Sequence, residues 1–91
     1  MMTENAAPLE IERSLIGTLH LDGLDAPYVN LDQQPLIHSR LRVGDTEYAY
    51  ESSIPVQGHS AVLPEAITQF QSEGRQVLIA ERSDRYFIYL A

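Results

Sequence analysis

The segment "LIHSRLRVGDTEYAYESS", residues 36–53, decides the fold because two independent signals in it predict a β-hairpin. Gly44 and Asp45 form a glycine-first pair that suits a two-residue type II′ turn. This turn places Val43 opposite Thr46, and successive side chains then point to opposite faces. One face collects the apolar side chains of Ile37, Leu41, Val43, Tyr48 and Tyr50. The other face collects the polar side chains of His38, Arg40, Arg42, Glu47 and Glu51. A register shift of one residue would mix the two faces.

The C-terminal segment "RQVLIAERSDRYFIYLA", residues 75–91, predicts a second hairpin with Ser83 and Asp84 at its turn. In this register Glu81 faces Tyr86, and a four-residue loop over Arg82–Arg85 keeps the same pairing from Glu81 outward. Both faces of this hairpin are apolar. Such a strand pair is either central in the sheet or covered by a partner chain.

Self-association as a homodimer is therefore expected, because a single helix can hardly cover both faces of the second hairpin. Tyrosine and arginine are favoured anchors of protein interfaces. The candidate interface residues are Arg82, Arg85, Tyr86, Phe87 and Tyr89.

The segment "SAVLPEAITQFQSEG", residues 60–74, predicts a helix. Pro64 suits the first turn, Glu65 complements the N-terminal dipole, and Gly74 suits the position just beyond the C-terminus. One apolar stripe forms at helical spacing, from Leu63, Ala66, Ile67 and Phe70. A helix this short must be held by packing against a sheet.

The N-terminal third contains Asp22-Gly23, a pair typical of a type I′ turn. It predicts a strand over residues 13–21 and a partner strand from Leu24, which Pro27 would confine to a sheet edge. A helix over Pro8–Ile16 is the competing interpretation. The strand is favoured because Gly17 and Thr18 are poor helix formers.

These elements predict a single α+β domain over residues 9–91, with residues 1–8 as a flexible tail. The expected order is β-(β)-β-β-α-β-β, in a small, mostly antiparallel twisted sheet or partly open barrel with one helix. Ninety-one residues suffice for one modest core.

The composition excludes several classes of function. The net charge is −7, from 13 acidic residues and 6 arginines, which disfavours direct binding to nucleic acid or to anionic membranes. It favours instead a protein partner with a basic surface. The chain lacks cysteine, which excludes disulfides and thiolate chemistry. The segment "MMTENAAP" has no features of a secretory signal, so a cytoplasmic location is expected.

Three groups of polar residues are candidates for chemistry, and each has a simpler interpretation. Glu51 could orient His38 as a general base beside Arg40, but an exposed cross-strand ion pair is the commoner arrangement. His20, Asp22 and Asp25, with Asp32 further on, offer ligands for a cation, yet Asp22 is explained by its turn. His59 and Ser60 are adjacent, which rarely permits the facing geometry of a hydrolase. No catalytic, cofactor-binding or metal-binding residue is therefore predicted.

The segment "GHSAVLPEAI" resembles the swapped-hairpin AbrB/MazE group of DNA-binding regulators and antitoxins. Gly58, Ser60, Val62 and Pro64 match that group in type, over about the last third of the chain. The resemblance implies an antitoxin-like regulator that neutralises a partner toxin. The basic DNA-facing strand residues of the group have no counterpart between Gly58 and Pro64.

The sequence thus leads to three hypotheses of function. The first is a non-enzymatic interaction or regulatory module that acts through protein–protein contacts and self-associates. The second is the antitoxin-like regulator. The third is a small metal-binding protein that uses His20, His38 or His59 with carboxylates.

Overall fold

The computed structural model describes residues 7–34, 38–57 and 61–91. Ile37, Gly58, His59, Ser60 and most of the expected N-terminal tail lie outside these ranges. The described part of the chain forms seven strands, one α-helix and one 3-10 helix. They are β1 (Leu9–Ile11), the 3-10 helix η1 (Arg13–Leu15), β2 (Gly17–Leu21), β3 (Leu24–Asn30), β4 (Arg40–Val43), β5 (Thr46–Pro55), α1 (Val62–Ser72), β6 (Val77–Arg82) and β7 (Arg85–Leu90).

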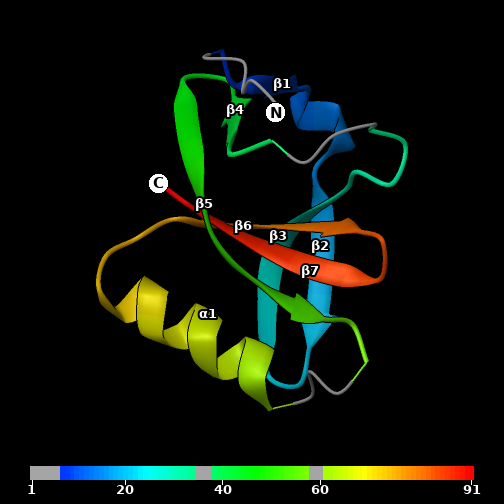
Figure 1. The fold of residues 1–91 in the computed structure, drawn as a ribbon. Helices are drawn as coiled ribbons and strands as arrows, with labels where there is room; N and C mark the ends of the chain where they lie inside the picture. The colour runs from blue at the N-terminus through cyan, green and yellow to red at the C-terminus, as the bar shows by residue number, and fades with distance from the viewer. Residues whose placement is uncertain (1–6, 35–37, 58–60) are drawn as a thin grey trace.

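The strands form one mixed sheet in the order β1-β4-β5-β7-β6-β3-β2 (Figure 1). The α+β class with one helix is confirmed, but the expectation of a mostly antiparallel sheet is only partly right. β1 pairs with β4, and β3 pairs with β6, in parallel. Parallel neighbours need long crossovers, which leave no local turn signal in the sequence.

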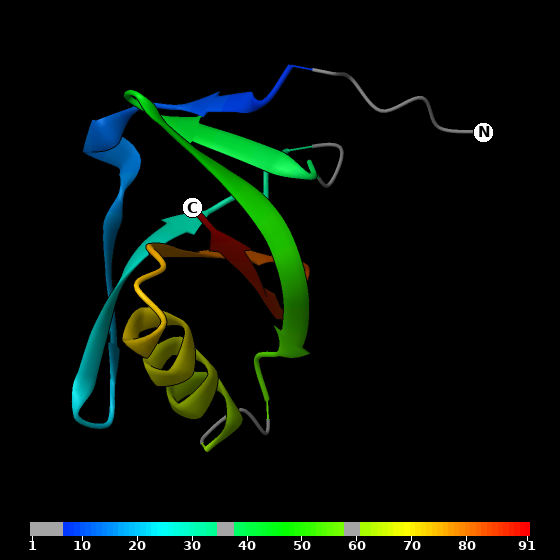
Figure 2. The same ribbon diagram turned by 90° about the vertical axis from the view of Figure 1, so that its left-hand side faces the viewer.

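The sheet curls strongly without closing. β1 and β2 lie at opposite edges of the sheet, yet only residues 12–16 separate them in the chain. Seven flat strands would place these edges about 29 Å apart at ~4.8 Å per strand. A link of this length spans about 20 Å at most. The edges must therefore approach each other, and Figure 2 shows the resulting curvature.

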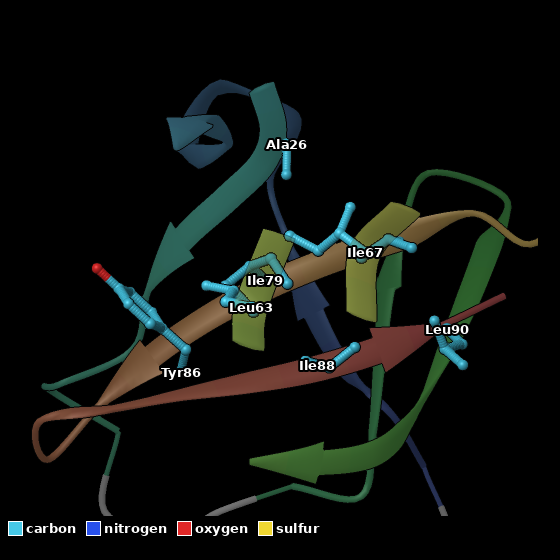
Figure 3. Close-up of a cluster of buried hydrophobic side chains, with 8 residues drawn as sticks. Ala26, Leu63, Ile67, Ile79, Tyr86, Ile88 and Leu90 are labelled. Carbon is cyan, nitrogen blue, oxygen red and sulfur yellow. The ribbon is translucent and has the colours of Figure 1, made fainter. Parts of the chain in front are cut away.

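Helix α1 covers one face of the sheet. Leu63 and Ile67 are fully buried, and they pack with Ile79 and Ile88 of the two central strands (Figure 3). Burial of each such side chain stabilises the fold by about 1.5–3 kcal/mol. Gly74 ends the helix at φ +82°, as predicted. The N–H of Gly74 donates to the Gln71 carbonyl, and that of Arg75 to the Phe70 carbonyl, which is a Schellman motif.

The opposite face of the central strands is covered by the curled sheet itself. Phe87 and Tyr89 pack there with Ile11 of β1 and Leu41 of β4. The second hairpin therefore lies in the centre of the sheet, which was one of the two expected alternatives. Because the chain covers both faces itself, a partner chain is not needed to explain the apolar pattern.

The three hairpin turns lie at the predicted residues, but the backbone conformation of one of them differs from the predicted turn type. Gly44 has φ +61°, and the register of β4 with β5 is the predicted one. Ser83 and Asp84 have φ values of 56° and 62°, so the C-terminal turn spans two residues rather than four. At Asp22-Gly23 only Gly23 has a positive φ, of 75°. A type I′ turn needs a positive φ at both positions, so that prediction is wrong.

The N-terminal predictions are corrected as well. Residues 13–15 form η1, so the strand expected over residues 13–21 begins only at Gly17, and the alternative helix over Pro8–Ile16 is also wrong. β3 is an inner strand despite Pro27. Its pairing with β6 starts at Tyr28, so Pro27 has a strand neighbour on one side only. Opposite Thr18 it occupies a position where the main-chain groups point away from β2, so its missing N–H removes no ladder hydrogen bond with β2.

Candidate functional site at the edge of the sheet

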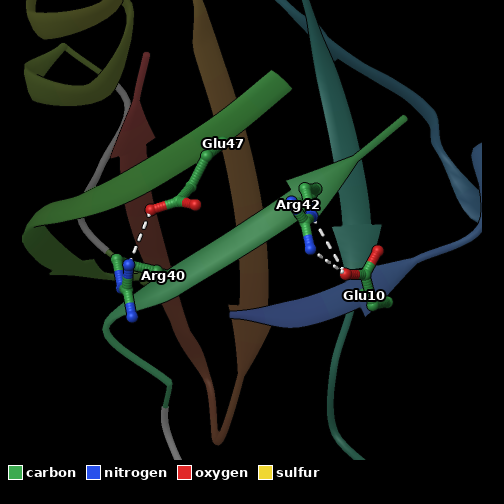
Figure 4. Close-up of polar contacts among 4 residues, drawn as sticks. All are labelled: Glu10, Arg40, Arg42 and Glu47. Atoms are coloured by element: carbon green, nitrogen blue, oxygen red, sulfur yellow. Dashed lines mark hydrogen bonds and ion pairs between the residues drawn. The ribbon is translucent and has the colours of Figure 1, made fainter. Parts of the chain in front are cut away.

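The predicted polar face of the first hairpin is an array of surface ion pairs. Arg40 contacts Glu47 at 2.9 Å, and Arg42 contacts Glu10 of β1 at 2.8 Å (Figure 4). The hydrogen bond to Glu10 raises the pKa of the Arg42 guanidinium. Exposed pairs of this kind contribute little to the stability of a fold. Their geometric effect is to hold β1 against β4.

The structure does not bring His38 and Glu51 together in a hydrogen bond or ion pair among the described residues. The pairing of β4 with β5 ends at Arg40 and Ala49, and the register of β5 with β7 shifts between Tyr50 and Ser52, around Glu51. The His38 main-chain carbonyl instead accepts a hydrogen bond of 2.6 Å from the Tyr89 hydroxyl.

His20 and Asp25 do meet, at 3.0 Å across β2 and β3, and both side chains are largely exposed. Asp32 lies elsewhere, where its carboxylate accepts the N–H of Ser83 at 2.9 Å. Within the described ranges no group of three or more His, Cys, Asp or Glu residues is placed to hold a metal ion.

The candidate interface residues divide between the core and its rim. Tyr86, Phe87 and Tyr89 are 8%, 6% and 2% exposed. Burial raises the pKa of the Tyr89 phenol to about 12. Tyr50, on β5, is 42% exposed and lies over Phe87 and Tyr89 at centroid distances of 5.9 and 6.0 Å.

Each of the two arginines beside the C-terminal turn donates a hydrogen bond to a neutral acceptor. Arg85 donates to the Ser53 hydroxyl at 3.0 Å, and Arg82 donates to the Gln34 carbonyl at 3.0 Å. They lie directly opposite each other in the register of β6 with β7. The contacts fix both side chains along the sheet surface.

The two edges of the sheet differ in how well they are protected. β1 has three residues, follows Pro8, and carries Glu10 at its centre. Short length, proline and charge are the usual means by which proteins prevent an edge from pairing with another chain. β2 has five residues, "GTLHL", with neither proline nor a carboxylate or arginine. Among the described residues, no strand pairs with β2 on its outer side.

The register shows which main-chain groups of β2 point outward. Leu21 and Leu24 flank the two-residue turn and form a hydrogen-bonded pair, and such pairs alternate along an antiparallel ladder. Thr18 and His20 therefore direct their N–H and carbonyl groups away from β3. Pro27, opposite Thr18, fits this alternation because that position needs no N–H. Two donors and two acceptors thus face outward.

The surroundings of β2 are acidic. The arginines nearest in sequence are Arg13 and Arg40, so residues 14–39 carry no basic charge other than histidine, and residues 61–74 carry none. Asp22 of the β2–β3 turn and Glu65 of α1 line a groove of about 440 Å³, which begins where β2 ends. Both carboxylates are exposed, and within the described ranges neither has an ion-pair partner.

Sequence reasoning missed the outward groups of Thr18 and His20. The strand was expected, but its place at the edge depends on the order of all seven strands. The available signal was the lack of charge and proline along "GTLHL", because a strand without edge protection is either central or free to pair.

Comparison with known proteins found no matching family model, no similar curated protein and no similar solved structure. The Gly58 and Ser60 positions that carry the resemblance to the swapped-hairpin group lie outside the described residues. Within the described ranges, no helix has both the length and the apolar character required to cross a membrane.

Proposed function

We propose that this chain is a non-enzymatic module that works through protein–protein contacts and binds an extended segment of a partner protein along the outer edge of β2. Addition of a strand to an exposed sheet edge is a recurring mode of peptide recognition. Main-chain hydrogen bonds supply the affinity in this mode, and alternate side chains supply the specificity. The observation that carries the proposal is the unprotected edge of β2, with Thr18 and His20 directed outward.

The contrast with β1 supports this assignment. Both strands end the same sheet, and only β1 has the features that prevent pairing with other chains. An edge that lacks such features is a hazard for aggregation unless its pairing is used. β2 pairs with β3, and β3 pairs with β6 of the central hairpin, so the edge is already in place before a partner binds and little entropy is lost on binding.

The side chains of β2 also support an added strand. Leu19 and Leu21 face the helix and are half-buried, so part of each apolar surface stays in contact with water. A neighbouring strand would cover that surface with its own alternate side chains. The bound segment is therefore expected to have apolar residues at every second position.

The test is a selection of random twelve-residue peptides displayed on phage, with two matched variants. Thr18→Pro/His20→Pro removes the two outward N–H groups and keeps the ladder with β3, whereas Thr18→Ala/His20→Ala removes the same side chains and keeps the N–H groups. Peptides selected on the wild type should bind the proline variant at least about tenfold more weakly, and the alanine variant within about threefold.

The controls separate binding from folding. Amide spectra should show that α1 and the β6–β7 hairpin are unchanged in the proline variant; if they are not, the single variant His20→Pro replaces it. Selected peptides that bind the proline and alanine variants equally well would contradict the proposal, as would a selection that enriches no peptide.

A further inference from the structure

We infer that the segment bound by β2 is basic, with a lysine or arginine that reaches the groove between Asp22 and Glu65. This inference rests on the proposed function, because it names the chemistry of the partner at the same edge.

The charge is strongly one-sided around β2. The β2–β3 hairpin and α1 contain Asp22, Asp25 and Glu65 and no arginine, whereas all six arginines lie elsewhere in the chain. Within the described part of the chain, the ion-pair partner of Asp25 is His20, at 3.0 Å in an exposed cross-strand pair. The side chains of these two elements would therefore present more negative than positive charge to a strand placed along β2, which attracts a basic segment and repels an acidic one.

The groove gives this attraction a defined position. It follows directly on the end of β2, where Asp22 begins the turn, and one side of α1 forms its other wall through Glu65 and Gln69. Leu24 of β3 adds an apolar side chain to the lining of the groove. A long side chain with an apolar stem and a charged end matches such a groove, because the stem packs on apolar surface while the charge meets the carboxylates.

A second copy of this chain fits the edge less well. Two β2 strands related by a two-fold axis would bring two acidic hairpins side by side, and each would be short of positive charge. Like charges placed together across an interface oppose association. The charge distribution thus favours a different, basic chain over self-pairing at this edge.

The experiment uses the peptides selected on the full chain and compares two double variants of equal charge change. Asp22→Asn/Glu65→Gln neutralises the groove, and Asp45→Asn/Glu51→Gln neutralises two exposed carboxylates on the β4–β5 hairpin. Selected peptides should contain lysine or arginine next to an alternating apolar pattern. The groove variant should bind them about three- to tenfold more weakly, and the control variant within about twofold.

The outcomes distinguish this inference from the proposed function. If the selected peptides are neutral or acidic and bind the wild type but not Thr18→Pro/His20→Pro, the inference of a basic partner is wrong and the edge of β2 remains the binding site. Equal weakening in both double variants would overturn the position of the basic residue in the groove. Sedimentation that shows a dimer of the free chain, lost in the proline variant, would overturn the basic partner in favour of a second copy. If the selected peptides bind the proline variant as tightly as the wild type, both the inference and the proposed function are wrong.

Discussion

The hydroxyl of Tyr89 in β7 donates a 2.6 Å hydrogen bond to the main-chain carbonyl of His38, 51 residues earlier in the chain. Tyr89 is 2% exposed and lies at the centre of the sheet, whereas His38 lies just before β4. The bond therefore connects the central hairpin to the strands that curl over it. A buried phenol without an acceptor would be unfavourable, so this contact also accounts for a tyrosine within an apolar cluster.

Tyr89→Phe should lower the free energy of unfolding by about 1 kcal/mol at neutral pH, because one hydrogen bond is lost and the ring remains in place. Urea denaturation of the two proteins measures this difference. A loss above about 3 kcal/mol would contradict it, since it would require the ring itself to be displaced.

The same pair of proteins should respond differently to alkaline pH. Burial raises the pKa of Tyr89 to about 12, and the pKa of Tyr28 is raised to about 12 by burial and by its hydrogen bond to Glu81. Between pH 10 and 12 the unfolded chain releases these protons first, so stability falls as the pH rises. Tyr89→Phe removes one of the two groups. Its disadvantage relative to the wild type should shrink above pH 10 and reverse by about pH 11, and a constant difference would contradict the burial of the phenol.

The turn at Ser83 and Asp84 places two non-glycine residues in the left-handed region, at φ 56° and 62°. Each such residue is disfavoured by about 1 kcal/mol relative to glycine. Asp84→Gly should therefore stabilise the chain by about 0.5–1 kcal/mol. Asp45→Gly is the matched control in the other turn, where the residue lacks a positive φ, and it should destabilise by about 0.4–1 kcal/mol. Equal effects in urea denaturation would contradict the assigned turn conformations.

Substitution of Phe87 shows whether the C-terminal hairpin is part of the core or part of an interface. Because Phe87 is only 6% exposed, Phe87→Ala should lower the free energy of unfolding by about 3–5 kcal/mol. Tyr50→Ala should cost about 1–2 kcal/mol, because this ring is 42% exposed and contributes mainly its contacts with Phe87 and Tyr89. If Phe87→Ala kept full stability and instead dissociated an oligomer, the C-terminal hairpin would be an interface after all.

The sequence was informative wherever the interactions are local. The Gly44-Asp45 pair and the alternation around it predicted the register of β4 and β5, and Ser83-Asp84 did the same for β6 and β7. The helix was predicted from its apolar stripe and from Gly74. These features depend on residues within a few positions of one another, so the chain alone specifies them.

The relationships that place the candidate site are not local. β3 meets β6 across about fifty residues, and β1 meets β4 across about thirty. Neither pairing has a turn signature, so neither the order of the sheet nor the open edge of β2 was predictable. The polar pair of His38 and Glu51 was predicted by extending a regular ladder, and the register shift around Glu51 interrupts that regularity. The ion pair of Arg42 with Glu10 was not predicted either, because it depends on the non-local pairing of β1 with β4.

The central claim is that the edge of β2 is open in the free chain and pairs with an added strand. Amide hydrogen exchange at residues 18–21, followed by NMR with and without a selected peptide, tests it most directly. In the free chain, Thr18 and His20 should exchange rapidly and Leu19 and Leu21 slowly, because only the latter two bond to β3. The peptide should then slow Thr18 and His20 by at least about tenfold. Equal protection of all four amides in the free chain, or fast exchange at Thr18 and His20 in the saturated complex, would contradict the account.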